Sequence, residues 1–365
     1  MSPQKNTSLW FSCFFSCLAA GLLSGCYTLT QGYEQVKMLT RRVPLDEVLK
    51  ESNEKPERMN KLKLVPEVLA FAQQRIKLTP GSSYQHYISL DRPVLSYIVQ
   101  AADKRALKLK TWWFPVVGAQ PYLGYFDKQK AIDFQKSLVN EGYDTVMGGV
   151  QAFSLLGYFP DPIYSSMLDG NETAEFVELL FHETLHRTVY VPDAYTFNEN
   201  LAEFVARHAT VLFLKERSSG LQQVAAYQEK QNKMQAARIA FRKALASARQ
   251  ELERFYAQPD VAKMPMAEFL KKREEKFAEL HAAYQSQSGE QVKGTPYANF
   301  FQPGYFNNAR ILSASVYESR QEPFEQLLER TGSDLANFVQ AVKKCVASEH
   351  ASEDQMWTIV ANCKG

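Results

Sequence analysis

The sequence has few cysteines, little glycine or proline, and almost no surplus of charge. Its 365 residues include five cysteines, 17 glycines and 16 prolines, which excludes a disulfide-built scaffold and a fibrous chain. The net charge is only +2 and no basic block stands out, so nucleic acid is not expected as a partner. The 45% apolar content instead predicts a folded protein with a substantial core.

Long apolar runs are also scarce, and the clearest one lies near the N-terminus. Lys5 is the only charge before an apolar run from Leu9 to Leu23, which serines interrupt and which is short for a bilayer span. A charged start, an apolar stretch and small residues before a cleavage point indicate a secretory signal. The ending Leu23-Ser24-Gly25-Cys26 resembles a bacterial lipoprotein signal. The resemblance implies that residues 1–25 are removed and that Cys26 carries lipid. An ordinary signal peptide or an N-terminal anchor helix is the alternative.

The same resemblance sets the expected location and the state of the remaining cysteines. Tyr27, rather than Asp, follows Cys26, which for such lipoproteins favours the outer membrane, facing the periplasm. With the signal removed and Cys26 modified, Cys345 and Cys363 are the cysteines that remain. An oxidising compartment favours a disulfide between them that closes the C-terminal tail. Two free thiols are the alternative.

Hydrophobic patterning predicts a predominantly helical α+β protein with a small sheet. The residues before 111 indicate a tether and a helical region interrupted by prolines. Aromatic and β-branched runs such as Trp112–Phe114 and Thr145–Met147 suit strands, and Gly148–Ser154 reads as a turn into another strand. The regions expected along the chain are 1–25 (signal), 26–110 (tether and helices), 111–216 (mixed core), 217–290 (long helical hairpin) and 291–365 (C-terminal helices).

Helical spacing also predicts where individual helices lie. The hairpin is expected to break at Pro259 and Pro265, and residues 286–303 are expected to form a loop. The predicted helices are at about 128–141, 173–189, 197–216, 306–318 and 323–348.

The segment from Phe181 to His186 carries the strongest chemical signal. Apolar residues at helical spacing place it on a helix, where residues four apart share a face. His182 and His186 can therefore both direct an imidazole nitrogen at one zinc ion. Glu183 lies beside them and can reach a metal-bound water as the general base. Two packed histidines and a surface Glu are the alternative interpretation.

A second segment supplies a candidate third ligand. Glu199 lies 13 residues after His186, near the start of the next predicted helix, and zincins need one more protein ligand from outside the His pair. Glu199 could instead close a capping box with Thr196. Glu203 lies one turn beyond Glu199 and is expected, with Asn198, to support the ligands; Glu203 could accept the outer N–H of an imidazole. A solvent-exposed Glu203 is the alternative.

These motifs resemble the gluzincin metallopeptidases, which include thermolysin and the alanyl-type zinc aminopeptidases. The chain more closely resembles a family of bacterial putative aminopeptidase lipoproteins. The shared features include Trp112-Trp113-Phe114-Pro115, Gly124-Tyr125-Phe126-Asp127, Gly148-Gly149-Val150 and Asn307-Asn308-Ala309-Arg310 with Tyr317. The resemblance implies a zincin-like catalytic core at 111–216, completed by the C-terminal region, and one Zn²⁺ for each chain.

It also implies roles for residues outside the zinc motifs. Tyr317 is the first candidate for stabilising the oxyanion, and Tyr190, Tyr195 and His208 are weaker choices. Gly149 and Val150 belong to a strand that precedes the metal helix and could pair with a peptide backbone. Asn308 and Arg310 are further candidates for substrate binding.

The function expected is therefore a membrane-anchored zinc aminopeptidase acting on peptides. A zinc endopeptidase of the cell envelope is one alternative. A lipid-anchored binding or scaffold protein without catalysis is the other. Because structural zinc sites normally use four protein ligands, a set of three favours catalysis.

Overall fold

The computed structural model describes residues 34, 36–51, 53–114, 118–151, 160–217, 220–314, 320–347 and 352–363. These residues form a mainly helical structure with small sheets, which confirms the predicted α+β class. None of the helices in this part of the chain is long and apolar enough to cross a bilayer. Cys26 and Tyr317 lie outside the described residues, so their predicted roles stay predictions.

The N-terminal region is helical only in its first half, which corrects the prediction for residues 26–110. Its helices are α2 (Leu45–Glu51), α3 (Pro56–Leu62), α4 (Val65–Phe71) and the π-helical turn η1 (Ala72–Ile76). The chain then forms strands β2 (His86–Ile88) and β3 (Ser96–Ala102). Burial alternates along most of β3, as it does in a strand with one covered face.

Strand β3 is the centre of an antiparallel sheet with the order β6–β3–β7. Its neighbours are β6 (Leu123–Tyr125) and β7 (Asp144–Val150), so this sheet crosses the expected boundary at residue 110. The predicted helix at 128–141 is confirmed as α5 (Lys128–Asn140) and packs on the sheet. The predicted turn at Gly148 and Gly149 is wrong, because both residues lie inside β7. A Cβ on Gly149 would stand 2.6 Å from Val94, so the strand needs glycine there.

The described strands also form two further small sheets. The first pairs β4 (Trp112–Phe114), which confirms the strand predicted there, with β5 (Gly118–Gln120). The second joins β1 (Val43–Pro44), β2 and β8 (Ile163–Tyr164), and β8 leads into the short helix α6 (Ser165–Leu168). Ser166 of α6 donates a 2.6 Å hydrogen bond to the carbonyl of Gln151, the residue after β7. This bond ties the end of β7 to the segment that enters the next helix.

The two predicted helices around the zinc motifs are α7 (Thr173–Thr188) and α8 (Tyr195–Lys215). They pack side by side and form the centre of the largest apolar core. Buried Phe213 of α8 meets Phe181 of α7 and Phe71 of α4 edge to face, and Phe181 packs on Phe71 in a tilted arrangement. The apolar faces of α7 and α8 are buried in this core. Polar residues on the same two helices, between the apolar ones, face each other where the helices meet.

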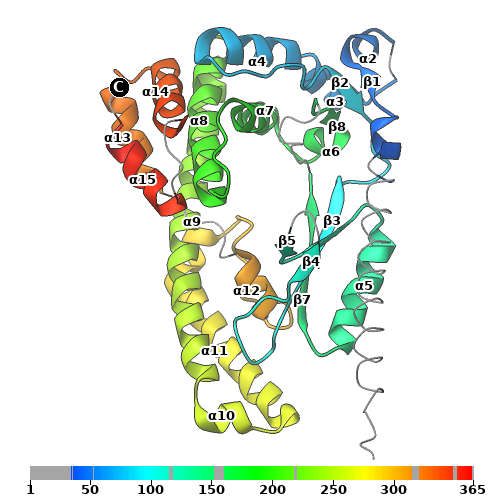
Figure 1. The fold of residues 1–365 in the computed structure, drawn as a ribbon, viewed down its shortest axis with the longest axis vertical. Coiled ribbons are helices and arrows are strands. Elements are labelled where there is room, and N and C mark those ends of the chain that lie inside the picture. The colour runs from blue at the N-terminus through cyan, green and yellow to red at the C-terminus, as the bar shows by residue number, and fades with distance from the viewer. Residues whose placement is uncertain are drawn as a thin grey trace, which may run out of the picture.

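The predicted hairpin consists of α9 (Gly220–Tyr256), α10 (Pro259–Lys263) and α11 (Met266–Val292). Pro259 and Pro265 stand at the two breaks, as the sequence predicts, because proline starts a helix easily but cannot continue one. The loop expected from residue 286 begins later, because α11 continues to Val292, which is buried in the hairpin core. Figure 1 shows α12 (Asn308–Ala314) lying between this hairpin and the sheet.

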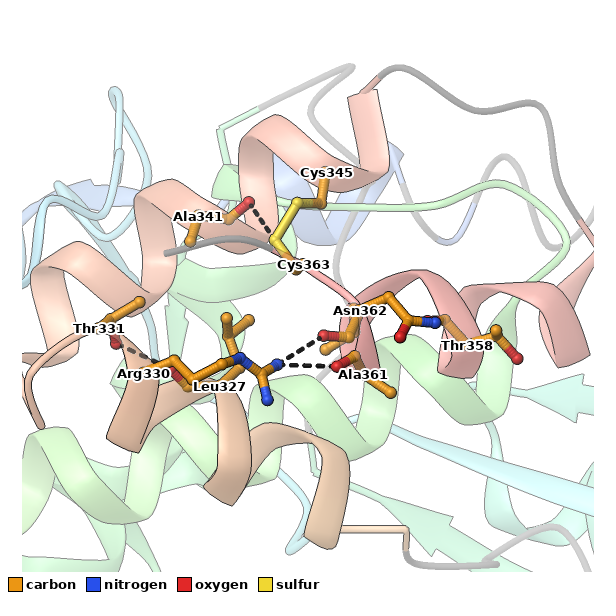
Figure 2. The surroundings of a disulfide bond; sticks show 10 residues. Leu327, Arg330, Thr331, Ala341, Cys345, Thr358, Ala361, Asn362 and Cys363 are labelled. Atoms are coloured by element: carbon orange, nitrogen blue, oxygen red, sulfur yellow. Dashed lines mark hydrogen bonds between the residues drawn. A yellow bond between two sulfur atoms is a disulfide. The ribbon is translucent and has the colours of Figure 1, made fainter.

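The C-terminal region packs against α8. Its helices are α13 (Glu322–Arg330), α14 (Leu335–Ala347) and α15 (Glu353–Ala361). The single helix predicted at 323–348 is broken, because Gly332 and Ser333 adopt positive φ angles of 77° and 56°. A disulfide joins Cys345 of α14 to Cys363, the pairing expected from the sequence (Figure 2). It closes the chain end over the same core.

Candidate metal centre

Three potential ligand atoms from two helices meet at one point. Nε2 of His182 lies 3.1 Å from Nε2 of His186 and 3.4 Å from Oε2 of Glu199, and Nε2 of His186 lies 3.4 Å from Oε1 of Glu199. Zinc bonds of about 2.0–2.1 Å in a tetrahedron place neighbouring ligand atoms roughly 3.3 Å apart. The two imidazole nitrogens and the carboxylate therefore lie at about the separations expected between ligands of one zinc ion. Among the described residues, no fourth His, Cys, Asp or Glu joins this group.

The helices themselves explain how the ligands meet. His182 and His186 stand one turn apart on α7, and Glu199 stands in the second turn of the neighbouring helix α8. The alternative capping box with Thr196 is wrong, because α8 begins at Tyr195 after Ala194 and has no side-chain cap. Glu199 instead turns its carboxylate toward the imidazoles.

Asn198 fixes the connection between the two helices. Its Oδ1 accepts the N–H of Val191 at 2.9 Å, and its Nδ2 donates to the carbonyl of Val191 at 2.7 Å. Asn198 is only 2% exposed, so these bonds satisfy backbone groups that water cannot reach. The predicted supporting role is thus made specific: Asn198 contacts the turn backbone, and thereby sets where Glu199 lies.

The charges at the centre suit a cation. Burial disfavours the charged form of Glu199, but hydrogen bonding to His182 and His186 prevails and lowers its pKa to about 2. A carboxylate and two imidazole nitrogens are the donor set that zinc accepts. Nδ1 of His186 is buried and has no hydrogen-bond partner within the described residues. Packing and the contacts of Nε2 with His182 and Glu199 therefore hold this ring in place.

Glu183 lies beside the ligands in a largely enclosed setting. Burial raises the pKa of its carboxyl above the ordinary value. The imidazoles of His182 and His186 lower this pKa, but the negative charge of Asp161 raises it further. Asp161 is 4% exposed and lies 3.7 Å from Nη1 of Arg187, one turn after Glu183 on α7. Tyr84, whose backbone N–H donates to the Asp161 carbonyl, holds a positive φ of 64°. Strained backbone of this kind often accompanies functional sites.

A family model described as putative aminopeptidase matches residues 26–357. The chain belongs to this putative aminopeptidase family. The chain matches no curated protein and no solved structure. The family match covers α7, α8, the sheet and the hairpin, so the candidate ligands lie inside the part of the chain that the family model matches.

In this aminopeptidase-family chain, Glu203 has a different partner from the one expected. Its carboxylate pairs with Arg238 of α9, and Nδ1 of His186 remains without a partner in the described structure. No hydrogen bond joins Glu203 to His182 or His186 among the described contacts, so its expected role in orienting one of these rings stays a prediction. Helix α9 also contacts Glu178 of α7, whose Oε2 accepts from Gln231 at 2.9 Å. A partner 35 residues away in sequence leaves no local pattern from which α9 could have been placed beside the ligands.

The expected substrate-binding residues divide into three groups. Gly149 and Val150 lie in β7, at the edge of its sheet among the described strands. Asn308 is fully buried and its side chain is satisfied by Tyr256 and by the Asp103 carbonyl, so its predicted contact with substrate is wrong. Arg310 is half-buried, and its guanidinium lies over the rings of Tyr305 and Phe300.

The structure also places the three weaker candidates for stabilising the oxyanion. Tyr190 and Tyr195 flank the turn between α7 and α8 and are 45% and 50% exposed. Nδ1 of His208 lies 2.8 Å from the Phe204 carbonyl on its own helix, which gives that nitrogen a local partner. Asp161, Tyr84 and Arg187 are the neighbours of Glu183 that the sequence did not suggest. The sequence Pro160-Asp161-Pro162 indicates a turn, but nothing in it indicates a position beside α7.

Proposed function

We propose that this protein is a zinc-dependent aminopeptidase of the cell envelope, anchored by lipid on Cys26. The observation that carries the proposal is the meeting of His182, His186 and Glu199 at zinc-ligand spacing, with Glu183 beside them. Membership of the putative aminopeptidase family gives the reaction class. The set of three ligands supports a site that keeps one position for water or substrate.

The chain's own residues divide the work as follows. His182, His186 and Glu199 would hold the ion. When bound, Zn²⁺ polarises a carbonyl and lowers the pKa of a water molecule toward about 7. Glu183 accepts a proton from the attacking water and then passes it to the leaving amine. Burial raises the pKa of Glu183, so its carboxylate accepts a proton more readily than an ordinary glutamate does. We keep Tyr317 as the proposed source of the hydrogen bond to the oxyanion.

Strand β7 is the proposed support for the peptide backbone. Thr145 stands opposite Ala101 of β3, yet its carbonyl accepts a 3.0 Å hydrogen bond from the side chain of Asn307. Because backbone groups alternate in direction along a strand, those of Met147 and Gly149 point the same way as those of Thr145. A peptide pairing with this edge would add a strand to the sheet.

The test compares metal content and cleavage in the wild type and in Glu183→Gln. A library of free peptides and the same peptides with acetylated N-termini serve as substrates, and Glu175→Gln on the same helix is the matched control. We expect Glu183→Gln to keep its zinc and to lose cleavage by a factor of about 10³ or more, while the control keeps both. Equal cleavage by the wild type and Glu183→Gln would remove Glu183 from the mechanism.

The same assay separates the alternatives. An aminopeptidase requires a free amine, so acetylation should abolish cleavage. Undiminished cleavage of acetylated peptides would establish an endopeptidase, and no cleavage at all would favour the binding-protein alternative. The anchor is tested by labelling cells with a radioactive fatty acid: we expect label on the wild type and none on Cys26→Ala, which should leave the membrane fraction.

A further inference from the structure

Arg310 of α12 is a cation that lies over two aromatic rings and forms no ion pair among the described residues. Its guanidinium carbon lies 3.3 Å from the centre of the Tyr305 ring and 5.1 Å from that of Phe300. Its Nε is buried without a hydrogen-bond partner, and no carboxylate forms an ion pair with it in the part of the chain that the structure describes. Burial accordingly lowers the pKa of Arg310 below the ordinary value.

The position of Arg310 on α12 is set by contacts to β7. Asn307 donates to the Thr145 carbonyl at 3.0 Å, and the backbone N–H of Asn308 donates to Asp144 Oδ2 at 3.0 Å. Arg310 lies one turn after Asn307, so both belong to the same stripe of the helix. Figure 1 shows α12 beside β7, between the sheet and the hairpin. Arg310 therefore stands close to the strand edge proposed for the peptide.

The chemistry of such an arginine points to one class of ligand. Stacking on aromatic rings occupies the faces of the guanidinium, and because Nε is buried, the edge formed by the two Nη groups is the one available to a partner in the same plane. A planar fork of N–H donors matches a carboxylate through two parallel hydrogen bonds. Because the ring contacts already fix the side chain, little further rotamer entropy is lost when a carboxylate binds.

We propose that Arg310 binds a carboxylate of the peptide substrate, downstream of the bond that is cleaved. The inference rests on the proposed function, because an aminopeptidase holds the N-terminus at the metal and the rest of the peptide must extend away from it. The carboxylate can be the C-terminus of a short peptide or an acidic side chain. Arg310 thereby selects among substrates and takes no part in the bond cleavage itself.

Binding and cleavage are measured separately with the full chain. Calorimetry on the zinc-loaded Glu183→Gln protein compares trialanine with trialanine amide, and an amidated tripeptide with Asp at its centre with the Asn equivalent. The same comparisons follow with Arg310→Gln, Arg310→Lys and Arg254→Gln, the last an exposed arginine of the hairpin. The kcat/KM values of the four peptides are then measured with Glu183 restored.

We expect one of the two carboxylates to bind about tenfold more tightly than its neutral counterpart. Which pair shows the difference identifies the C-terminus or the side chain. The preference should vanish in Arg310→Gln, weaken in Arg310→Lys and persist in Arg254→Gln. If the protein that keeps Arg310 binds all four peptides equally well, the proposal is overturned, whatever the Arg310 variants show. A preference that survives in Arg310→Gln would overturn it as well. By contrast, a protein that discriminates in binding but cleaves no peptide would refute the proposed function alone.

Discussion

Asn198 binds both backbone groups of Val191, so one buried side chain closes the turn that brings α7 and α8 to a common point. The next residue is Glu199, whose carboxylate lies 3.4 Å from each imidazole nitrogen. The geometry of the candidate metal centre therefore depends on a residue that is not one of its ligands.

Replacement of Asn198 by Ala should destabilise the fold and weaken metal binding together. The variant leaves the buried N–H and C=O of Val191 unpaired, which should lower the free energy of unfolding by about 3 kcal/mol. Urea unfolding and zinc titration measure the two effects, with the exposed Asn140→Ala as the control. A variant with full stability and full zinc affinity would show that the turn does not need this side chain.

Replacement of Glu199 by Ala should remove the metal while leaving the fold in place. Loss of a residue that hydrogen-bonds to a ligand typically reduces zinc affinity by about 10–100-fold. Loss of a direct ligand should reduce it by more than about 100-fold. Glu203→Ala is the matched control one turn away, because that carboxylate pairs with Arg238 instead of the imidazoles. Zinc titration with circular dichroism decides the matter; similar affinities in both variants would exclude Glu199 as a ligand.

The buried pair of Asp144 and Arg273 should couple the sheet to the hairpin. Two hydrogen bonds of 2.8 and 3.1 Å join them, and the two side chains are 5% and 6% exposed, respectively. Arg273→Met leaves a buried carboxylate without its cation, which should cost about 3–5 kcal/mol. Arg273→Met combined with Asp144→Asn should cost less than the sum of the single changes, because the unpaired charge is gone. Additive losses in urea unfolding would refute the coupling.

The disulfide should stabilise the C-terminal helices without affecting the metal. Its cysteines are separated by 18 residues, for which the loss of chain entropy in the unfolded state predicts about 3 kcal/mol. Replacing both cysteines by Ala should lower the free energy of unfolding by up to this amount and leave zinc affinity unchanged. A change in zinc affinity would mean that α14 and α15 help to position α8.

The ion pair of Asp169 and Arg58 should make stability depend on pH in acid. Hydrogen bonding to Arg58 lowers the pKa of Asp169 below its ordinary value of 3.8. A depressed carboxyl pKa adds stability that is present above the unfolded value and lost as the pH falls through the folded value. The wild type should thus exceed Asp169→Asn by about 1 kcal/mol at pH 7, a modest figure because the carboxylate is 37% exposed. Urea unfolding at pH 7 and at about pH 2.5 should show this difference shrinking toward zero; a constant difference would contradict the assignment.

Residues close in sequence were predicted well, because a helix or strand records its period locally. The placement of His182 and His186 on one helix face follows from their spacing of four residues, and the hairpin breaks follow from Pro259 and Pro265. Strand β3 was missed, since a short run with alternating burial is hard to distinguish from the proline-broken helices before it.

The sequence by itself determined the helix that carries His182 and His186, the order of the main helices and the family to which the chain belongs. Only the tertiary structure decided that Glu199 faces the imidazoles, that Glu203 pairs with Arg238, and that Asn308 is buried while Arg310 has no ion pair among the described residues. These outcomes depend on contacts between residues far apart in the chain, where each side chain takes the partner that packing brings within reach. No local pattern encodes that choice.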